Sequence, residues 1–351
     1  MPPLRIASYN IAWFAQLFDQ RNQLVADQEW SAIRGVTRRR QAEAIAEVLR
    51  RVDADCYSVV EAPNSGHRQS CVAELEGFAA HFGLRQRAGL IGFENPTDQE
   101  IALLFDPDRL TAEHAPIGEV LGEAAARTGR LPFGAPRFDS VFPADLDGDG
   151  EITLHRFSKP PLEAVVEDRA TGRTLRLIAV HLKSKVPHSP GSPVRQRRRA
   201  VEDRVKQHTQ AMWLRARLEE HMAAGEPVIA LGDFNDGPGF DHLEELAGRS
   251  SVELIMGDPA APETRMVNPF TDLSDGPAPS TARFVNNHTG APIEALIDFI
   301  VLSPDLAAAA RPRWRIWHPN NDPGIVADTA LRSSLLDASD HFPVSVDLDF
   351  G

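Results

Sequence analysis

The stretch EPVIALGDFND, residues 226–236, runs from an apolar segment directly into a loop of acids and amides. A short apolar run of this kind, closed by Gly232, is typical of a buried strand. Gly-Asp and Asn-Asp are also common turn dipeptides, so GDFN alone predicts only a strand and a turn. Asp233 and Asn235 gain a chemical interpretation only if other strands end in polar groups too.

The other apolar runs of the chain do end in polar groups. Their last residues are carboxylates, amides or imidazoles, at Asn10, Glu61, His181, Asp298, and Asp340 with His341. Loops at strand ends often carry functional residues, so we expect these side chains at one rim of the sheets. Each alone has a plainer interpretation as a turn cap, a solvated carboxylate or a hydrogen-bonded histidine. Together, in this order, they are poorly explained by chance.

This polar set has the composition of a metal-assisted phosphoester site. Cations such as Mg²⁺ or Mn²⁺ take oxygen ligands, which Glu61, Asp340, Asn10, Asp233 and Asn235 supply. Phosphoryl transfer needs neutralised charge on the phosphate oxygens and a water delivered in line. It also needs a base that works near neutral pH, usually histidine. The sequence therefore predicts a divalent-metal-dependent phosphoester hydrolase.

Around this set, the chain alternates short apolar strands with helices. Residues 37–52 and 200–225 have apolar side chains at helical spacing, and residues 160–185 predict a hairpin that turns at 170–172. Further strands are predicted at 5–14, 55–62, 100–107, 226–236, 294–304 and 339–350. No linker interrupts the order, so we expect two sheets with helices outside, in a single domain over 1–351.

Composition narrows the class of protein. The 351 residues carry 37 basic and 50 acidic side chains, a net charge of −13, which is unusual for a protein that grips long nucleic acid. No apolar run could span a bilayer, and the first residues do not resemble a signal peptide. Cys56 and Cys71 cannot build a disulfide framework. We expect a cytoplasmic protein with no membrane span, and no protein partner can be inferred.

These segments resemble, in order, the endonuclease/exonuclease/phosphatase superfamily, whose best-known member is pancreatic deoxyribonuclease. The matching segments are RIASYNIAWF (5–14), YSVVEA (57–62), QEIALLFDPDRL (99–110), RFSKPPLEAVV (156–166), IAVHLKSK (178–185), ALGDFND (230–236), LIDFIVLS (296–303) and ASDHFPVSV (338–346). The HLKSK motif is most similar to bacterial nucleases and phosphodiesterases of the superfamily. The resemblance implies an α/β fold, a four-layer sandwich of two packed mixed β-sheets flanked by helices.

The resemblance also implies roles for the acids and amides. Glu61 and Asp340, with Asn10, would hold Mg²⁺ or Mn²⁺ against a phosphate oxygen, and Asn10 would also contact the phosphate. Asp233 and Asn235 would position the attacking water or a second metal, or bond the phosphate itself.

Two histidine–carboxylate pairs complete the site that the resemblance implies. His341, oriented by Asp298, would act as general base. His181, oriented by Glu100, would stabilise the transition state or protonate the leaving oxygen. The roles of the two histidines are interchangeable at this stage.

Several positions depart from the family pattern. Members that cut duplex DNA often carry arginine just after the metal-binding glutamate, where this chain has Ala-Pro-Asn at 62–64. Members that act at abasic sites carry tyrosine at the place of His181, which excludes that branch. Lys159 stands where many members have arginine; with Lys183 it would neutralise the phosphate, but lysine lacks the bidentate fork of arginine.

The substrate therefore stays open at the sequence level. A nuclease acting on DNA or RNA is the leading prediction, with single-stranded or short substrates favoured over long duplexes. The alternative is a phosphatase or phosphodiesterase of a small-molecule or lipid-headgroup phosphoester. A third class, a non-catalytic binding protein on this fold, fits poorly with the retention of every expected polar residue. Residues 15–36, 111–150 and 186–200 are the candidate specificity loops.

A second metal loop is suggested by DLDGDGEIT, residues 145–153. Asp145, Asp147 and Asp149 have the spacing of calcium ligands, but Arg156 stands where an EF-hand has its bidentate glutamate. The segment is either a polar turn or a structural Ca²⁺ site completed by other residues. A bound Ca²⁺ would order the loop that carries Lys159.

Overall fold

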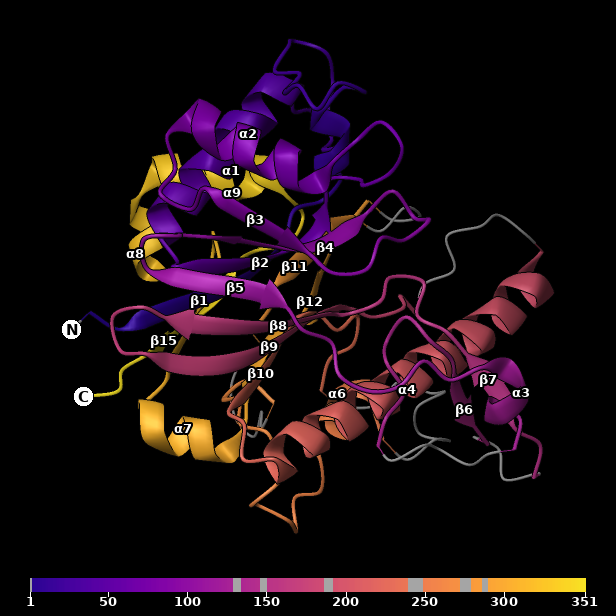
Figure 1. The fold of residues 1–351 in the computed structure, drawn as a ribbon. Coiled ribbons are helices and arrows are strands. Elements are labelled where there is room, and N and C mark those ends of the chain that lie inside the picture. The colour runs from indigo at the N-terminus through magenta and orange to yellow at the C-terminus, as the bar shows by residue number, and fades with distance from the viewer. Residues whose placement is uncertain are drawn as a thin grey trace.

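The computed structural model describes residues 2–128, 134–145, 150–185, 192–238, 249–271, 279–285 and 290–351. Two large mixed β-sheets pack face to face between two layers of helices (Figure 1). The predicted α/β sandwich is thereby confirmed.

The first sheet has six strands in the order β14-β15-β1-β2-β4-β3. Their bounds are β1 (Leu4–Asn10), β2 (Cys56–Ala62), β3 (Ala88–Ile91), β4 (Glu100–Phe105), β14 (Arg313–Ile316) and β15 (Val344–Leu348). β1 and β2 are parallel, and the other neighbours are antiparallel. Asn10, the last residue of β1, lies opposite Val60, so Glu61 follows at the same end of the sheet.

The second sheet has five strands in the order β13-β10-β9-β8-β5. Their bounds are β5 (Leu110–His114), β8 (Leu162–Asp168), β9 (Arg173–His181), β10 (Val228–Asp233) and β13 (Asp298–Leu302). The parallel pairing of β9 with β10 places His181 opposite Asp233, and the antiparallel pairing of β10 with β13 places Asp233 opposite Asp298. The register thus collects three of the predicted site residues at one sheet end. Asp298 is the first residue of β13, and Asp340 and His341 precede β15, so the expectation that these residues end their strands is wrong.

Alternating side chains of these strands face two different cores, as the period of a strand requires. Ile6 lies in the apolar layer between the two sheets, with Leu231 and Ile300 of the second sheet. Ala7 and Tyr9 of β1 face the other way, into a cluster with α1 (Arg38–Val52).

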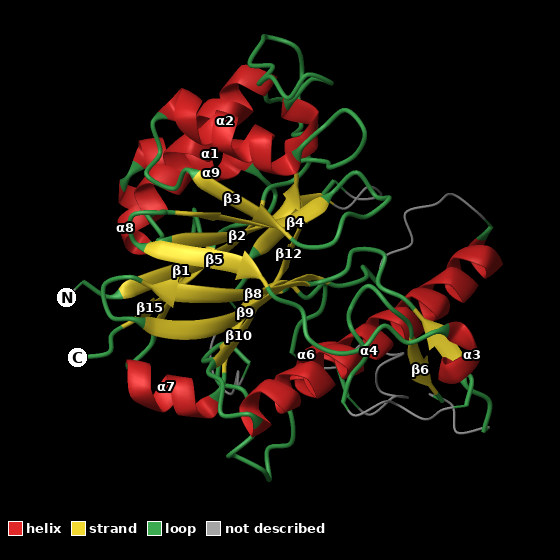
Figure 2. Ribbon diagram, in the orientation of Figure 1, coloured by secondary structure: helices red, strands yellow, loops and turns green. Residues whose placement is uncertain are grey.

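Helices cover the outer face of each sheet (Figure 2). On the first sheet lie α1, α2 (Cys71–Phe82), α8 (Pro323–Ala327) and α9 (Thr329–Ala338). On the second lie α4 (Pro193–Ala223) and α6 (Ser251–Met256), whose apolar residues form a third cluster. None of the helices in the described residues is both long and apolar enough to cross a membrane.

Smaller elements complete the described structure. They are η1 (Phe14–Leu17), α3 (Glu123–Ala126), α7 (Pro304–Ala310), and two two-stranded sheets, β6 (Phe142–Ala144) with β7 (Thr153–His155) and β11 (Ala282–Val285) with β12 (Pro292–Ala295). Both cysteines are buried free thiols.

Most predicted elements are present, with some shifts in their ends. The helix predicted from residue 200 starts earlier, at Pro193, because Ser192 caps it: its side chain accepts a hydrogen bond from the Arg195 backbone. Part of the loop expected at 186–200 is therefore helical, and residues 186–191 lie outside the described residues.

Candidate active site

Asp233 ends β10 at a point where two backbones approach closely. Gly232 has φ 139°, and a Cβ at this position would lie 2.0 Å from the carbonyl oxygen of Val180. Only glycine fits here, so the residue before Asp233 is fixed by the packing of β9 against β10. Asn235 then turns the chain with a left-handed φ of 52°.

This turn holds the Asp233 carboxylate with several donors. Oδ1 accepts the backbone N–H of Asn235 at 2.7 Å, and Oδ2 accepts Nδ2 of Asn235 at 3.2 Å. Asn10, from the other sheet, donates its Nδ2 to Oδ2 at 3.0 Å. Asn10 is buried, and no described residue bonds its Oδ1. One amide oxygen is thus left available in the buried floor of the site.

The predicted pair of His341 and Asp298 is present. His341 Nδ1 lies 2.8 Å from Asp298 Oδ2, and both residues are buried. Thr281 Oγ1 accepts the backbone N–H of Asp298 at 3.0 Å, which fixes the end of β13. Ser339 Oγ donates to the carbonyl oxygen of Asn10 at 2.8 Å and accepts the backbone N–H of His341 at 3.1 Å. Ser339 therefore joins the histidine to the end of β1.

The pair expected between His181 and Glu100 is replaced by other contacts in the structure. Nδ1 of His181 lies 3.0 Å from Nζ of Lys159, and Nε2 lies 3.7 Å from Asp233 Oδ2. The Glu100 carboxylate accepts Nδ2 of Asn95 at 2.6 Å instead. The Glu100 carboxylate is thus bonded by Asn95 of the 92–99 loop and by the backbone N–H of Ser65.

Glu61 sits at a bulge in β2, where the pairing with β4 shifts between Val60 and Ala62. Its φ of 56° is left-handed, and such a bulge redirects a side chain at a strand end. The carboxylate accepts the backbone N–H of Trp13 at 3.1 Å. Burial raises the pKa of Glu61, while Lys159 and His341 oppose this rise.

Asp340 lies in the same charged neighbourhood. Its negative charge adds to the rise in the Glu61 pKa and also acts on His341. Glu61, Asp340 and His341 therefore lie close enough together for their charges to interact.

Two further acids and a histidine form a buried cluster in the site. Asp233, Asp298 and His341 offer ligand atoms that all lie within 4.8 Å of one another. Because Asp298 already bonds His341, we interpret this cluster as a histidine–carboxylate pair beside Asp233 rather than as a separate metal site.

The charges of this cluster shift the pKa values of its members. Burial, aided by the negative charge of Asp298, raises the pKa of Asp233 to about 7. Burial opposes the charged form of His341, but the attraction and hydrogen bond of Asp298, with Asp233 and Asp340, raise its pKa to about 10. Burial lowers the pKa of His181 well below 6.5, and nearby Lys159 lowers it further. The two histidines therefore differ in charge near neutral pH.

The two predicted phosphate lysines differ as well. Lys159 lies at the site, where its Nζ donates to Gln99 Oε1 at 2.5 Å and faces His181. Lys183 instead forms an ion pair with Asp203 of α4 at 3.2 Å. Lys159 is thus the better placed of the two to meet a phosphate.

The proposed calcium loop is described only in part. The side chain of Asp145 accepts the backbone N–H of Gly150 at 3.1 Å, as in a tight polar turn. Asp147 and Asp149 lie outside the described residues.

Sequence reasoning missed three residues that position the site. Ser339 carried no expected role although it belongs to the segment ASDHFPVSV, where its place just before Asp340 and His341 was the available signal. Thr281 lies outside the matching segments and Gln99 is the first residue of one of them, and only the packing reveals their contacts.

Comparison with known proteins agrees with this fold. The model of the endonuclease/exonuclease/phosphatase family matches residues 7–341. The chain therefore belongs to the endonuclease/exonuclease/phosphatase family, whose name covers enzymes that cleave phosphoester bonds. No match was found among curated proteins.

Solved structures share the fold over nearly the whole chain. A family protein from Bacteroides thetaiotaomicron has 16% identity and a TM-score of 0.52, covering 100% of this chain and 99% of its own. A mannosyl-6-phosphatase from the same organism has 16% identity and a TM-score of 0.51, covering 99% and 100%. Truncated TDP2 from Caenorhabditis elegans has 14% identity and a TM-score of 0.50, covering 99% and 97%. At these identities the likeness is one of fold.

Proposed function

We propose that this protein is a divalent-metal-dependent phosphodiester hydrolase. The observation that carries the proposal is the meeting of both sheets at one rim: Asn10 bonds Asp233 at 3.0 Å, beside the pair of His341 with Asp298. Membership of a phosphoester-cleaving family supports the same reaction class.

The residues fit a divalent cation. Glu61 and Asp340 offer carboxylate oxygens, and Asn10 Oδ1 is a buried oxygen that no described residue bonds. Oxygen donors of this kind suit Mg²⁺ or Mn²⁺. A bound cation would neutralise charge on a phosphate oxygen and so favour attack by water.

The neutral histidine would act as a hydrogen-bond donor. Because His181 Nδ1 faces the Lys159 ammonium, its proton resides on Nε2, which lies near Asp233. His181 would donate from Nε2 to a phosphate oxygen, and Lys159 would add a positive charge beside it. Such preorganised donors stabilise charge that develops in the transition state.

The water would lose its proton to a carboxylate of the site. Asp233 is held by three donors and has a pKa near neutral, which supports it as the base. His341, kept charged by Asp298, would then donate to the phosphate or to the leaving oxygen. This reverses the role first expected of His341, whose neighbours keep it protonated.

Two classes of substrate remain in the proposal. The leading one is DNA or RNA in single-stranded or short form. The second is a small-molecule or lipid-headgroup phosphoester. It is favoured by the net charge of −13 and by Ala-Pro-Asn at 62–64, where duplex-cutting relatives often carry arginine. The same metal and histidine set would serve both classes, because substrate choice resides in the loops.

A substrate panel tests the proposal. The purified protein is offered plasmid, single-stranded DNA, RNA, bis-p-nitrophenyl phosphate and p-nitrophenyl phosphate, each with Mg²⁺, Mn²⁺ or Ca²⁺. Nicked plasmid or shortened strands support the nuclease, and activity confined to small esters supports the alternative.

Three site variants provide the control for this panel. Replacing Asp233, His181 or His341 with alanine is expected to lower turnover by at least about 10²-fold. Cleavage near the wild-type rate by all three variants would exclude this site.

A further inference from the structure

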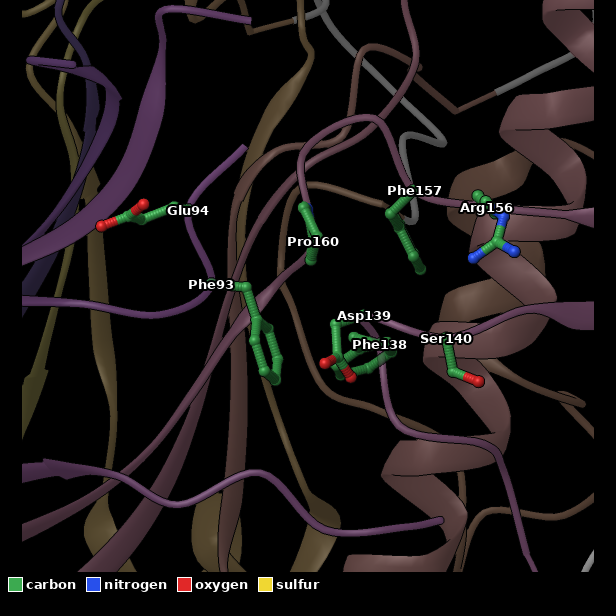
Figure 3. A pocket seen from close by; sticks show the side chains of 8 residues that line it. All are labelled: Phe93, Glu94, Phe138, Asp139, Ser140, Arg156, Phe157 and Pro160. Carbon is green, nitrogen blue, oxygen red and sulfur yellow. The ribbon is translucent and has the colours of Figure 1, made fainter. Parts of the chain in front are cut away.

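The proposed reaction does not use a cavity of about 270 Å³, whose lining side chains are drawn in Figure 3. Three separate segments of the chain form its walls. Phe93 comes from the loop after β3, Phe138 and Asp139 from the segment before β6, and Phe157 and Pro160 from the segment between β7 and β8.

One peptide bond and one hydrogen bond connect the walls of this cavity to Lys159. Pro160 directly follows Lys159, and consecutive Cα atoms are about 3.8 Å apart. The loop that carries Phe93 ends at Gln99, which accepts a hydrogen bond from Lys159 Nζ at 2.5 Å. A phosphate held by Lys159 would therefore lie next to the two segments that carry Phe93 and Pro160.

Half of the residues that line the cavity carry rings, which are already fixed in place. The ring of Phe93 is backed by the Arg137 guanidinium, 5.5 Å from its centroid, and by the edge of His114 at 4.7 Å. Phe138 and Phe157 meet edge to face at 5.5 Å. Phe138 and Phe157 are buried, so the partly exposed ring of Phe93 is the one that a planar group would stack on. A ring held by such neighbours loses little freedom when it does so.

The charged side chains around the cavity are already paired. Arg137 holds Asp139 through two hydrogen bonds of 2.7 and 2.8 Å, and Arg156 bonds Glu123 at 2.8 Å. The carboxylate of Glu94 points away from the other lining side chains (Figure 3). Among the described residues that line the cavity, no unpaired cation is available for a second phosphate. The walls therefore suit a neutral, planar group.

We propose that the cavity binds the base of a nucleotide unit whose phosphate lies at Lys159, so that the substrate is a nucleoside phosphoester. This inference rests on the proposed function. The volume lies just below the range of about 300–1,000 Å³ found for pockets of drug-sized ligands. It suits one unpaired base and excludes a base pair. A single-stranded or short substrate follows, because its bases are free to leave a stack.

Binding of products tests the base pocket without any need for turnover. Calorimetry in Mg²⁺ compares adenosine 5′-monophosphate with ribose 5-phosphate, which has the same phosphate and sugar but no base. We expect the nucleotide to bind at least about 10-fold more tightly to the wild-type protein, as stacking on an aromatic ring predicts. Phe93→Ala should abolish this difference and leave ribose 5-phosphate binding within about 2-fold.

Two further variants guard against loss of folding. Phe93→Leu keeps apolar volume but removes the planar ring, so it should retain the fold and still lose most of the preference for the nucleotide. Phe82→Leu changes a partly buried ring of α2 that packs in a different apolar cluster from Phe93, and should keep the preference.

Several outcomes would overturn the inference. Equal binding of the two ligands by the wild-type protein would show that the cavity does not read a base and would favour a sugar phosphate. If the Phe93 variants lose affinity equally for the nucleotide and for ribose 5-phosphate, Phe93 only supports the loop. If no ester of the panel is cleaved but the nucleotide preference persists and depends on Phe93, the proposed function fails and the base pocket stands.

Discussion

The Nζ atom of Lys159 lies 3.0 Å from Nδ1 of His181. An ammonium group can only donate, so this histidine nitrogen is the acceptor and the ring proton lies on Nε2. Burial and the lysine charge both lower the pKa of His181. The contact therefore fixes the tautomer and keeps the ring neutral, where a carboxylate partner would have favoured the charged form.

Removing the Lys159 amine is expected to impair the reaction strongly. Lys159→Met should lower kcat by about 10²-fold, because a charge beside the phosphate and the partner of His181 are both lost. Lys183→Met is the matched control, since the Lys183 amine is ion-paired with Asp203. Steady-state kinetics on bis-p-nitrophenyl phosphate should show a loss below about 10-fold for that variant. Equal losses in the two variants would contradict the assignment of Lys159 as the phosphate cation.

Asp298 is expected to act through His341 as a positioning residue. Asp298→Asn should lower kcat by at least about 10-fold with little change in KM, because the amide holds the ring without the charge that keeps it protonated. The double variant Asp298→Asn/His341→Ala should be no slower than His341→Ala alone. If the loss of kcat in the double variant equals the product of the two single losses, the two residues act independently.

Metal removal should abolish activity, and Mg²⁺ or Mn²⁺ should restore it. A binding measurement that does not depend on turnover is the rise in Tm with added cation. This rise should correspond to a gain of about 2.7 kcal/mol in the free energy of unfolding when the cation concentration is about 100-fold above its Kd. Glu61→Gln should shrink this rise, whereas Glu43→Gln on the exposed side of α1 should not. If the cation raises the Tm of Glu61→Gln as much as that of the wild-type protein, Glu61 is not a metal ligand.

Glu74 should make stability depend on pH. Burial raises its pKa from 4.5 to about 7, and no described residue bonds its Oε2. The folded state keeps the proton of Glu74 to a higher pH than the unfolded state does. The contribution of this proton to folding stability is therefore complete below pH 4.5 and is lost as the pH rises to 7. Glu74→Gln should therefore add on the order of 1 kcal/mol at pH 8 and almost nothing at pH 4.

Thermal unfolding at the two pH values measures this difference. The exposed Glu43→Gln variant serves as the control, with no change expected at either pH. A gain in Glu74→Gln that is the same at both pH values would point to packing rather than to the buried charge.

Calcium binding by the 145–153 segment stays a prediction. Titration calorimetry of the wild-type protein should detect one site, and Asp145→Asn should weaken it. An absence of heat in the wild-type protein would leave the polar turn as the interpretation, in line with the hydrogen bond from Gly150 to Asp145.

Much of the site was predictable because its residues sit at strand ends. The strands that end at Asn10, Glu61, His181 and Asp233 were visible as apolar runs, and parallel pairing brings their ends together. The partner of His181 was not predictable, because it depends on how the 92–99 loop satisfies Glu100 and leaves Lys159 facing the imidazole. Whether HLKSK marks the bacterial nuclease branch stays a prediction.

Several elements of the fold escaped sequence reasoning for physical reasons. β3 and β14 have only four residues each and lie at the edges of their sheet, where alternation is too short to detect. α2 carries Gly77 in its interior, which weakens a helical pattern. α9 has mixed polarity and is held by its packing on α1.

Trp13, Glu61 and Asn235 all have left-handed backbones at the rim of the site, with φ of 60°, 56° and 52°. For residues other than glycine such conformations cost on the order of 1–3 kcal/mol each. Glu61→Gly would relieve strain in the same step that deletes a predicted metal ligand. A laboratory selection for heat resistance alone would therefore tend to accumulate inactive proteins. Selection for thermostability in this enzyme must be coupled to an assay of turnover.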